Sequence, residues 1–144
     1  MTARATRVVL ALLALSGAVI GAWATFAPRA FYDHFPGGGH TWVAPDGPYN
    51  EHLVRDVGQL NLALTVVTLF ALVVLSRQLV LATASAWLVY GVPHLVYHLR
   101  HLGPFSGSDV VSIPASLALG VAGALLLLVP ARSGAGAARP LERA

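Results

Sequence analysis

Four stretches of the chain consist almost entirely of apolar residues and are separated by more polar segments. They cover residues 8–26, 54–75, 79–102 and 110–129, each close to the roughly 20 residues that a helix needs to cross a bilayer. Because backbone groups in lipid must hydrogen-bond within their own segment, we predict four transmembrane α-helices. The predicted fold is all-α, an up-and-down four-helix transmembrane bundle in one domain, residues 1–130. Residues 28–49 then form a long extracytoplasmic loop between the first and second helices.

The composition supports a membrane protein and narrows its chemistry. Hydrophobic residues make up 56% of the 144 residues and charged residues only 10%, whereas soluble domains are nearer 25% charged. Cysteine is absent, which excludes disulfides, thiolate metal sites and thiol redox relays. All nine basic residues are arginines scattered over the termini and loops, so we expect the lipid bilayer as a partner and no nucleic acid.

The arginines also predict the orientation in a cell membrane. Six of them lie on the side of the two termini and the short second loop, and three lie on the other side. The positive-inside rule therefore predicts a multi-pass protein with cytoplasmic N- and C-termini and a disordered cytoplasmic tail, residues 131–144. An alternative is that residues 8–26 form a signal peptide cleaved after Ala22-Trp23-Ala24. The length of this apolar run and its Gly17-x-x-x-Gly21 spacing favour a retained helix.

Small residues mark two helix faces as packing surfaces. Ser112, Ser116 and Gly120 repeat every four residues in the fourth span. This face is expected to pack against Gly17 and Gly21, against a second copy in a homo-oligomer, or against a membrane-complex partner. Ser108 or Asp109 is expected to cap the fourth helix.

Polar residues recur along one face of the third span. Tyr90, His94, His98 and His101 fall within an arc of roughly 80° on a helix. An imidazole at membrane depth is costly unless it meets a partner, so this stripe is a candidate functional site.

The second span carries a matching polar face. The turn at Ser76-Arg77-Gln78 is so short that the second and third helices must form an antiparallel hairpin, in which residues at equal depth have numbers summing to about 154. Asp56 is then level with His98, and the two polar faces are expected to converge. The face on the second helix consists of His52, Arg55, Asp56 and Gln59, with Glu51 beside Arg55.

Several chemistries suit such a convergence. The first is a metal site for zinc, copper or non-haem iron. Its predicted ligands are His52, Asp56, His94 and His98, surrounded by Glu51, Arg55, Gln59, Tyr90 and His101. The second is non-covalent haem held by histidines, for redox chemistry. The third is a proton relay, or a site for a quinone or lipid head group. The polar pairs could instead be structural, in a non-enzymatic membrane accessory subunit.

The predicted loop, residues 28–49, interleaves aromatic residues with polar ones. Phe31, Tyr32, Phe35 and Trp42 favour an anchor in the membrane interface. The alternative is a lid over the histidines, with His34 or His40 as an additional ligand.

Two motifs carry a resemblance to known proteins. Residues 47–58, read as Gly-Pro-Tyr-Asn-Glu-His-Leu-Val-Arg-Asp-Val-Gly, and residues 93–98, read as Pro-His-Leu-Val-Tyr-His, resemble small, mostly uncharacterised four-span bacterial membrane proteins. Residues 31–36 look like part of the same pattern. The overall layout is also similar to DoxX-like four-helix membrane proteins. The resemblance implies a four-span topology and carries no catalytic residues.

Overall fold

The computed structural model describes residues 1–130 and is almost entirely helical. The elements are α1 (Ala3–Phe26), α2 (Pro28–His34), β1 (Pro36–Gly37), β2 (His40–Thr41), η1 (Ala44–Asp46), α3 (Glu51–Val74), α4 (Arg77–Arg100) and α5 (Asp109–Leu128). The all-α prediction is therefore confirmed, apart from a hairpin of two two-residue strands. The predicted tail, residues 131–144, lies outside the described residues.

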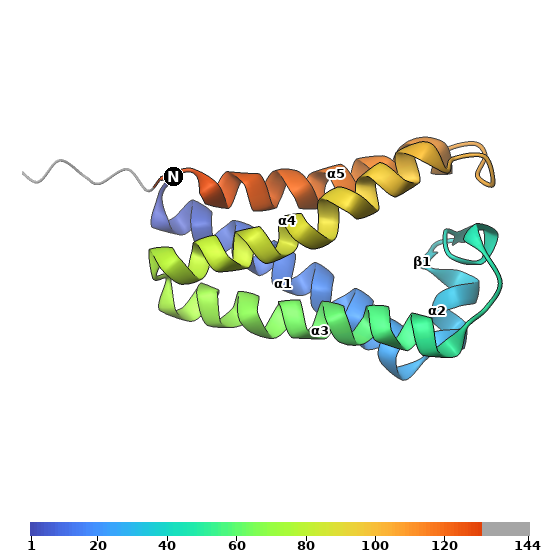
Figure 1. Ribbon diagram of the computed structural model, residues 1–144, viewed down its shortest axis with the longest axis horizontal. Coiled ribbons are helices and arrows are strands. Elements are labelled where there is room, and N and C mark those ends of the chain that lie inside the picture. The colour runs from blue at the N-terminus through green and yellow to red at the C-terminus, as the bar shows by residue number, and fades with distance from the viewer. Residues whose placement is uncertain (131–144) are drawn as a thin grey trace, which may run out of the picture.

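Four helices have the length and hydropathy to cross a membrane: α1, α3, α4 and α5. Their composition fits a multi-pass membrane protein. We call the end of the molecule with Met1, the α3–α4 turn and Pro130 the terminal end. The opposite end, where residues 28–49 and 101–108 lie, is the loop end (Figure 1).

The four helices meet at the terminal end in one apolar core. Leu10 of α1, Ala71 of α3, Ala84 of α4 and Leu127 of α5 are fully buried there. The Arg77 guanidinium closes this end by donating to the carbonyls of Leu127 and Leu128 at 2.8 and 2.6 Å. A helix leaves its last carbonyls without partners, so this arginine caps α5 from the start of α4.

Towards the loop end the helices separate into two pairs, α1 with α3 and α4 with α5 (Figure 1). A second apolar cluster, built on Ala24, Phe31 and Val54, joins α1, α2 and α3, and among residues 1–130 none of its members belongs to α4 or α5. Residues 28–49, which we call the covering segment, therefore pack on the α1–α3 side.

Glycines allow α1 and α3 to pack closely. A Cβ atom built on Gly17 would lie 3.2 Å from the Asn61 carbonyl oxygen, and one on Gly58 would lie 2.6 Å from the Thr25 nitrogen. The expectation that Gly17 and Gly21 could pack on the fourth span was therefore wrong, because both face α3. In α5, a Cβ atom built on Gly123 would lie 3.6 Å from Val9 of α1, nearer the terminal end.

Capping side chains mark the starts of α3 and α4, whereas α2 and α5 begin without one. Asn50 accepts from the Leu53 nitrogen at the start of α3, and Ser76 accepts from the Leu79 nitrogen at the start of α4. Ser108 is the N-cap residue of α5, but its side chain makes no capping hydrogen bond, so the predicted side-chain cap at the start of α5 is not formed. The Asp109 carboxylate instead accepts a hydrogen bond from Trp42 of the covering segment and pairs with His40.

Candidate functional site

The candidate site is a pair of histidines in the loop-end half of α4. His94 and His98 are one helical turn apart, and their Nε2 atoms lie 3.2 Å from each other. One ring donates its Nε2–H to the Nε2 lone pair of the other. His98 is only 9% exposed and His94 is half-buried, so the contact is partly shielded from the surroundings.

The second ring nitrogen of each histidine, Nδ1, has hydrogen-bonding capacity that residues 1–130 do not use. Neither Nδ1 atom has a hydrogen-bond partner among residues 1–130, and both are buried. In a neutral pair, the ring that donates through Nε2 keeps a lone pair on Nδ1, and the ring that accepts keeps an N–H there. The histidine pair thus offers one further donor and one further acceptor. Burying such a group without a partner costs about 1–3 kcal/mol.

Tyr90 and Asn61 extend this site towards the middle of the bundle. The Tyr90 ring stands edge-on to His94, with centroids 5.5 Å apart. The Tyr90 hydroxyl accepts from the Asn61 amide of α3 at 3.1 Å, and Asn61 is 1% exposed. Because Tyr90 accepts in this bond, its own O–H remains free to donate towards a ligand.

Deeper still, Trp87 of α4 donates to the Thr68 hydroxyl of α3 at 2.9 Å. The numbers of this pair sum to 155, and those of Asn61 and Tyr90 sum to 151. The hairpin register predicted for these two helices is therefore close to correct through the middle of the bundle. Sequence reasoning had passed over Asn61 and Thr68, although both interrupt an apolar run.

The second polar face predicted from the sequence lies elsewhere. On α3, His52 pairs with Asp56 at 3.3 Å, with side chains 87% and 51% exposed. Arg55 binds Glu51 at 2.8 Å and also donates to the Thr25 carbonyl at the end of α1. Gln59 is exposed on the same helix.

The four predicted metal ligands therefore form two separate pairs, His52 with Asp56 and His94 with His98. Within residues 1–130, no three histidine or acidic side chains come together in a way that could hold a metal ion. The expected convergence fails because α3 packs on α1 through Gly58, while Gly91 of α4 lies against Val121 of α5. The two helices diverge before their polar ends can meet.

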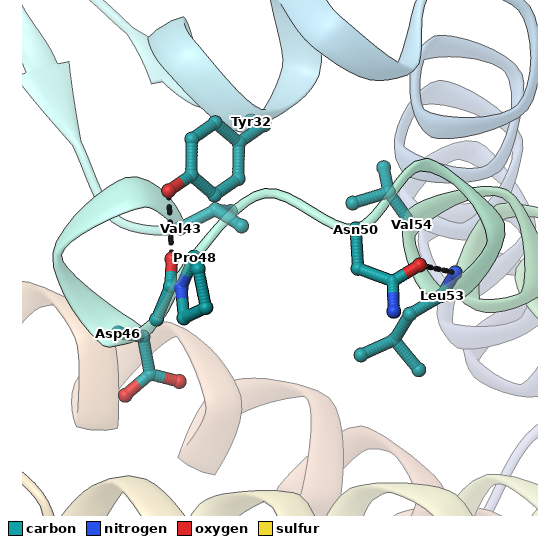
Figure 2. A pocket seen from close by; sticks show the side chains of 8 residues that line it. Tyr32, Val43, Asp46, Pro48, Asn50, Leu53 and Val54 are labelled. Carbon is teal, nitrogen blue, oxygen red and sulfur yellow. Dashed lines mark hydrogen bonds between the residues drawn. The ribbon is translucent and has the colours of Figure 1, made fainter.

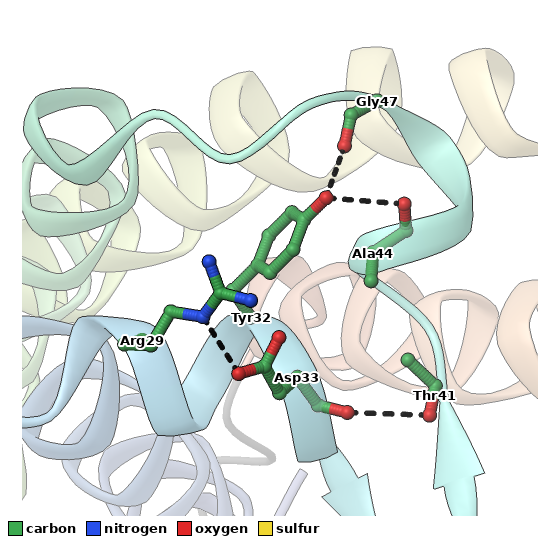
Figure 3. A network of polar contacts seen from close by, with 6 residues as sticks. All are labelled: Arg29, Tyr32, Asp33, Thr41, Ala44 and Gly47. Carbon is green, nitrogen blue, oxygen red and sulfur yellow. Dashed lines mark hydrogen bonds and ion pairs between the residues drawn. The ribbon is translucent and has the colours of Figure 1, made fainter.

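The covering segment is held together by its own polar contacts (Figure 3). The Tyr32 hydroxyl donates to the Gly47 carbonyl at 2.7 Å, and the Thr41 hydroxyl to the Asp33 carbonyl at 3.3 Å. Arg29 binds Asp33 at 2.7 Å, and this hydrogen bond raises the pKa of Arg29 above its ordinary value. These contacts make the segment a compact unit.

Three side-chain contacts join the covering segment to α4 and α5. Trp42 Nε1 and His40 Nδ1 both meet Oδ1 of Asp109, at 2.9 and 2.8 Å. The Tyr97 hydroxyl, next in sequence to His98, reaches Asp46 at 3.4 Å. His101 stacks on Tyr97 at 4.1 Å and is exposed, so it lies at the rim of the site. The sequence-based lid hypothesis named His40 as a metal ligand, whereas here it binds a carboxylate of α5.

A pocket of about 150 Å³ lies beside Asp46 (Figure 2). Its wall combines the aromatic ring of Tyr32 with apolar side chains of the covering segment and of α3, including Leu53. Asp46 thus connects a partly apolar pocket on the α3 side with Tyr97 on the α4 side.

Comparisons of the chain with protein-family models, curated proteins and solved structures return no match.

Proposed function

We propose that this protein crosses the membrane as an up-and-down bundle with cytoplasmic termini. The arginine distribution supports this orientation, and it places the loop end outside. In this orientation the histidine pair lies in the outer leaflet. We retain the proposed kinship with small four-span bacterial membrane proteins, because the topology fits it.

The function that we propose is binding of a membrane-soluble molecule whose polar head carries a hydroxyl or carbonyl group, such as a quinone, a quinol or a lipid. The observation that carries this proposal is that the Nδ1 atoms of His94 and His98 are buried and have no hydrogen-bond partner among residues 1–130. A hydroxyl group both donates and accepts, which is the combination that the pair lacks. The free O–H of Tyr90 adds a donor of the kind that a carbonyl oxygen binds.

A titration tests this proposal. The purified protein in nanodiscs is titrated with a short-chain ubiquinone, and binding is followed through tryptophan fluorescence. We expect saturable binding that the His94→Ala/His98→Ala double variant weakens about fivefold, because the quinone carbonyl accepts from the one Nδ1–H of the pair and a lost hydrogen bond contributes about 1 kcal/mol. The matched control is His52→Ala, which removes an exposed imidazole on another helix.

Equal affinity in the double variant and the wild type would contradict the proposal. The proposal would also fail if the purified wild-type protein contained no quinone or lipid and showed no saturable binding in the titration. An accessory subunit whose histidine pair is structural would then be the better account.

Metal binding is the second candidate, and one distance supports it. Two nitrogens bound to one tetrahedral zinc at 2.0–2.1 Å lie about 3.3–3.4 Å apart, close to the 3.2 Å between the two Nε2 atoms. The remaining ligands would be water or an added molecule, since three protein ligands do not meet within residues 1–130. Elemental analysis for zinc, copper and iron, on wild type and the double variant, tests this.

Haem suits the pair less well than a small ion does. Two axial ligands lie on opposite faces of the porphyrin, whereas the Nε2 atoms are in direct contact on one helix face.

A helix from a second copy or from a complex subunit could pack on α5. Ser116 is exposed there, and within residues 1–130 a Cβ built on Gly120 meets no heavy atom within 4 Å beyond the adjoining backbone of α5.

A further inference from the structure

Asp109 occupies an unusual position at the junction of the two helix pairs. It lies in the first turn of α5, and a single carboxylate oxygen meets both Trp42 Nε1 and His40 Nδ1. Its side chain is only 20% exposed. Hydrogen bonds to a carboxylate are roughly twice as strong as neutral ones, so this one residue holds much of the covering segment against α5.

The covering segment is attached differently on its two sides. On the α1–α3 side, Phe31 is buried with Ala24 and Val54, and its ring lies 5.8 Å from that of Trp23. On the α4–α5 side, the side-chain hydrogen bonds go to Asp109 and, more weakly, from Tyr97 to Asp46 at 3.4 Å. Apolar burial is non-directional, whereas hydrogen bonds break once the geometry is lost.

The internal contacts of the covering segment mean that it can move as a unit. Tyr32 ties α2 to η1 through the carbonyls of Ala44 and Gly47 (Figure 3). The covering segment is held by apolar burial on the α1–α3 side and by polar contacts on the α4–α5 side. We call it a cover, with its apolar side as the hinge and its polar contact with α5 as the latch.

We propose that Asp109 is the latch of this cover, and that its release from His40 and Trp42 opens the loop end beside His98. Asp46 then leaves Tyr97, since it belongs to the same stiff unit. The inference rests on the proposed function only for its purpose, which is to control access of the membrane-soluble ligand to the histidine pair. The opening itself is measurable without any ligand.

Acylation of histidines by diethyl pyrocarbonate, read at each site by mass spectrometry, tests the latch. In the wild type we expect buried His98 to react much more slowly than exposed His52, which serves as an internal reference. Asp109→Ala should raise the His98 rate about tenfold relative to His52, because the open state gains population when the hydrogen bond from Trp42 and the ion pair with His40 are lost.

A second variant removes the same contact by changing its partners in the covering segment. His40→Ala/Trp42→Phe removes both donors and keeps an aromatic ring near Phe35. It should raise the His98 rate as Asp109→Ala does, and combining all three changes should add little, because one contact is removed by either route. The matched control is Asp33→Ala, which cuts an ion pair inside the covering segment and leaves the contacts with α5 intact.

An unchanged His98 rate in both latch variants, or an equal rise in Asp33→Ala, would overturn the latch. Titration of the same variants with short-chain ubiquinone separates this failure from that of the proposed function. If labelling rises but the wild type binds no quinone, the latch stands without the proposed ligand. If the wild type binds quinone and no variant changes labelling, the ligand stands without the latch.

Discussion

The contact between Gly58 and α1 offers a direct test of how the first helix pair is held. A Cβ atom at this position would lie 2.5 Å from the Thr25 hydroxyl oxygen, 2.6 Å from the Thr25 nitrogen and 3.0 Å from the Ala24 carbonyl carbon. Two of these atoms belong to the backbone of α1, so they cannot rotate away. In Gly58→Ala the helices must separate by about 1 Å to restore ordinary contact distances of roughly 3.5 Å.

The expected cost follows from this separation. Overpacking of a well-packed interior costs typically 1–3 kcal/mol, and the rigid neighbours place Gly58→Ala near about 3 kcal/mol. Alanine gains up to about 1 kcal/mol over glycine within a helix, which leaves a net loss of about 2 kcal/mol. For a chain of this size, that loss lowers the melting temperature by roughly 4–8 °C.

The assay is unfolding of the purified protein in detergent, by temperature and by added SDS, followed by circular dichroism. Gly120→Ala is the matched control, since within residues 1–130 its added Cβ meets no heavy atom within 4 Å beyond the adjoining backbone of α5, and it should show the helix gain alone. A Gly58→Ala protein as stable as Gly120→Ala would refute the close packing of α1 on α3.

Three further variants probe other contacts of the bundle. Asn61→Leu removes the donor to Tyr90 and should destabilise the protein by about 1–2 kcal/mol in the same SDS unfolding assay, whereas an unchanged midpoint would contradict this hydrogen bond. Thr68→Val leaves the Trp87 N–H without its acceptor, and we expect a loss of about 1–3 kcal/mol together with a shift of tryptophan emission. Arg77→Ala uncaps the end of α5 and should cost about 1–2 kcal/mol and increase amide hydrogen exchange there, so unchanged exchange would count against the cap.

The sequence predicted the helices well because hydropathy over about 20 residues is a local property. The predicted second span, residues 54–75, compares with Glu51–Val74 for α3, and the hairpin register holds at the Trp87–Thr68 contact. The short turn at Leu75 and Ser76 determines this register, and a turn is also local in sequence.

The position of the polar faces could not be obtained in the same way. Asp56 could reach His98 only if α3 and α4 stayed in contact along their whole length. The neighbour on which a helix packs depends on the steric fit between residues far apart in the sequence. Here these contacts are Gly58 with Thr25 and Gly91 with Val121. Both glycines stand out in apolar spans, and they are the signal from which the divergence could have been suspected.

Asn61 and Tyr90 make the α3–α4 hydrogen bond nearest to the loop end among residues 1–130. On the terminal side of it, α3 and α4 satisfy each other's polar groups, as Trp87 and Thr68 do. On its loop side the helices part, and the imidazoles of His94 and His98 bind each other instead of a carboxylate of α3. The divergence that removes the predicted metal set thus also leaves both Nδ1 atoms without a partner among residues 1–130, and His98 is one residue away from Tyr97, which contacts Asp46 of the covering segment. The packing of α3 on α1 and of α4 on α5 therefore accounts for both the candidate site and its cover.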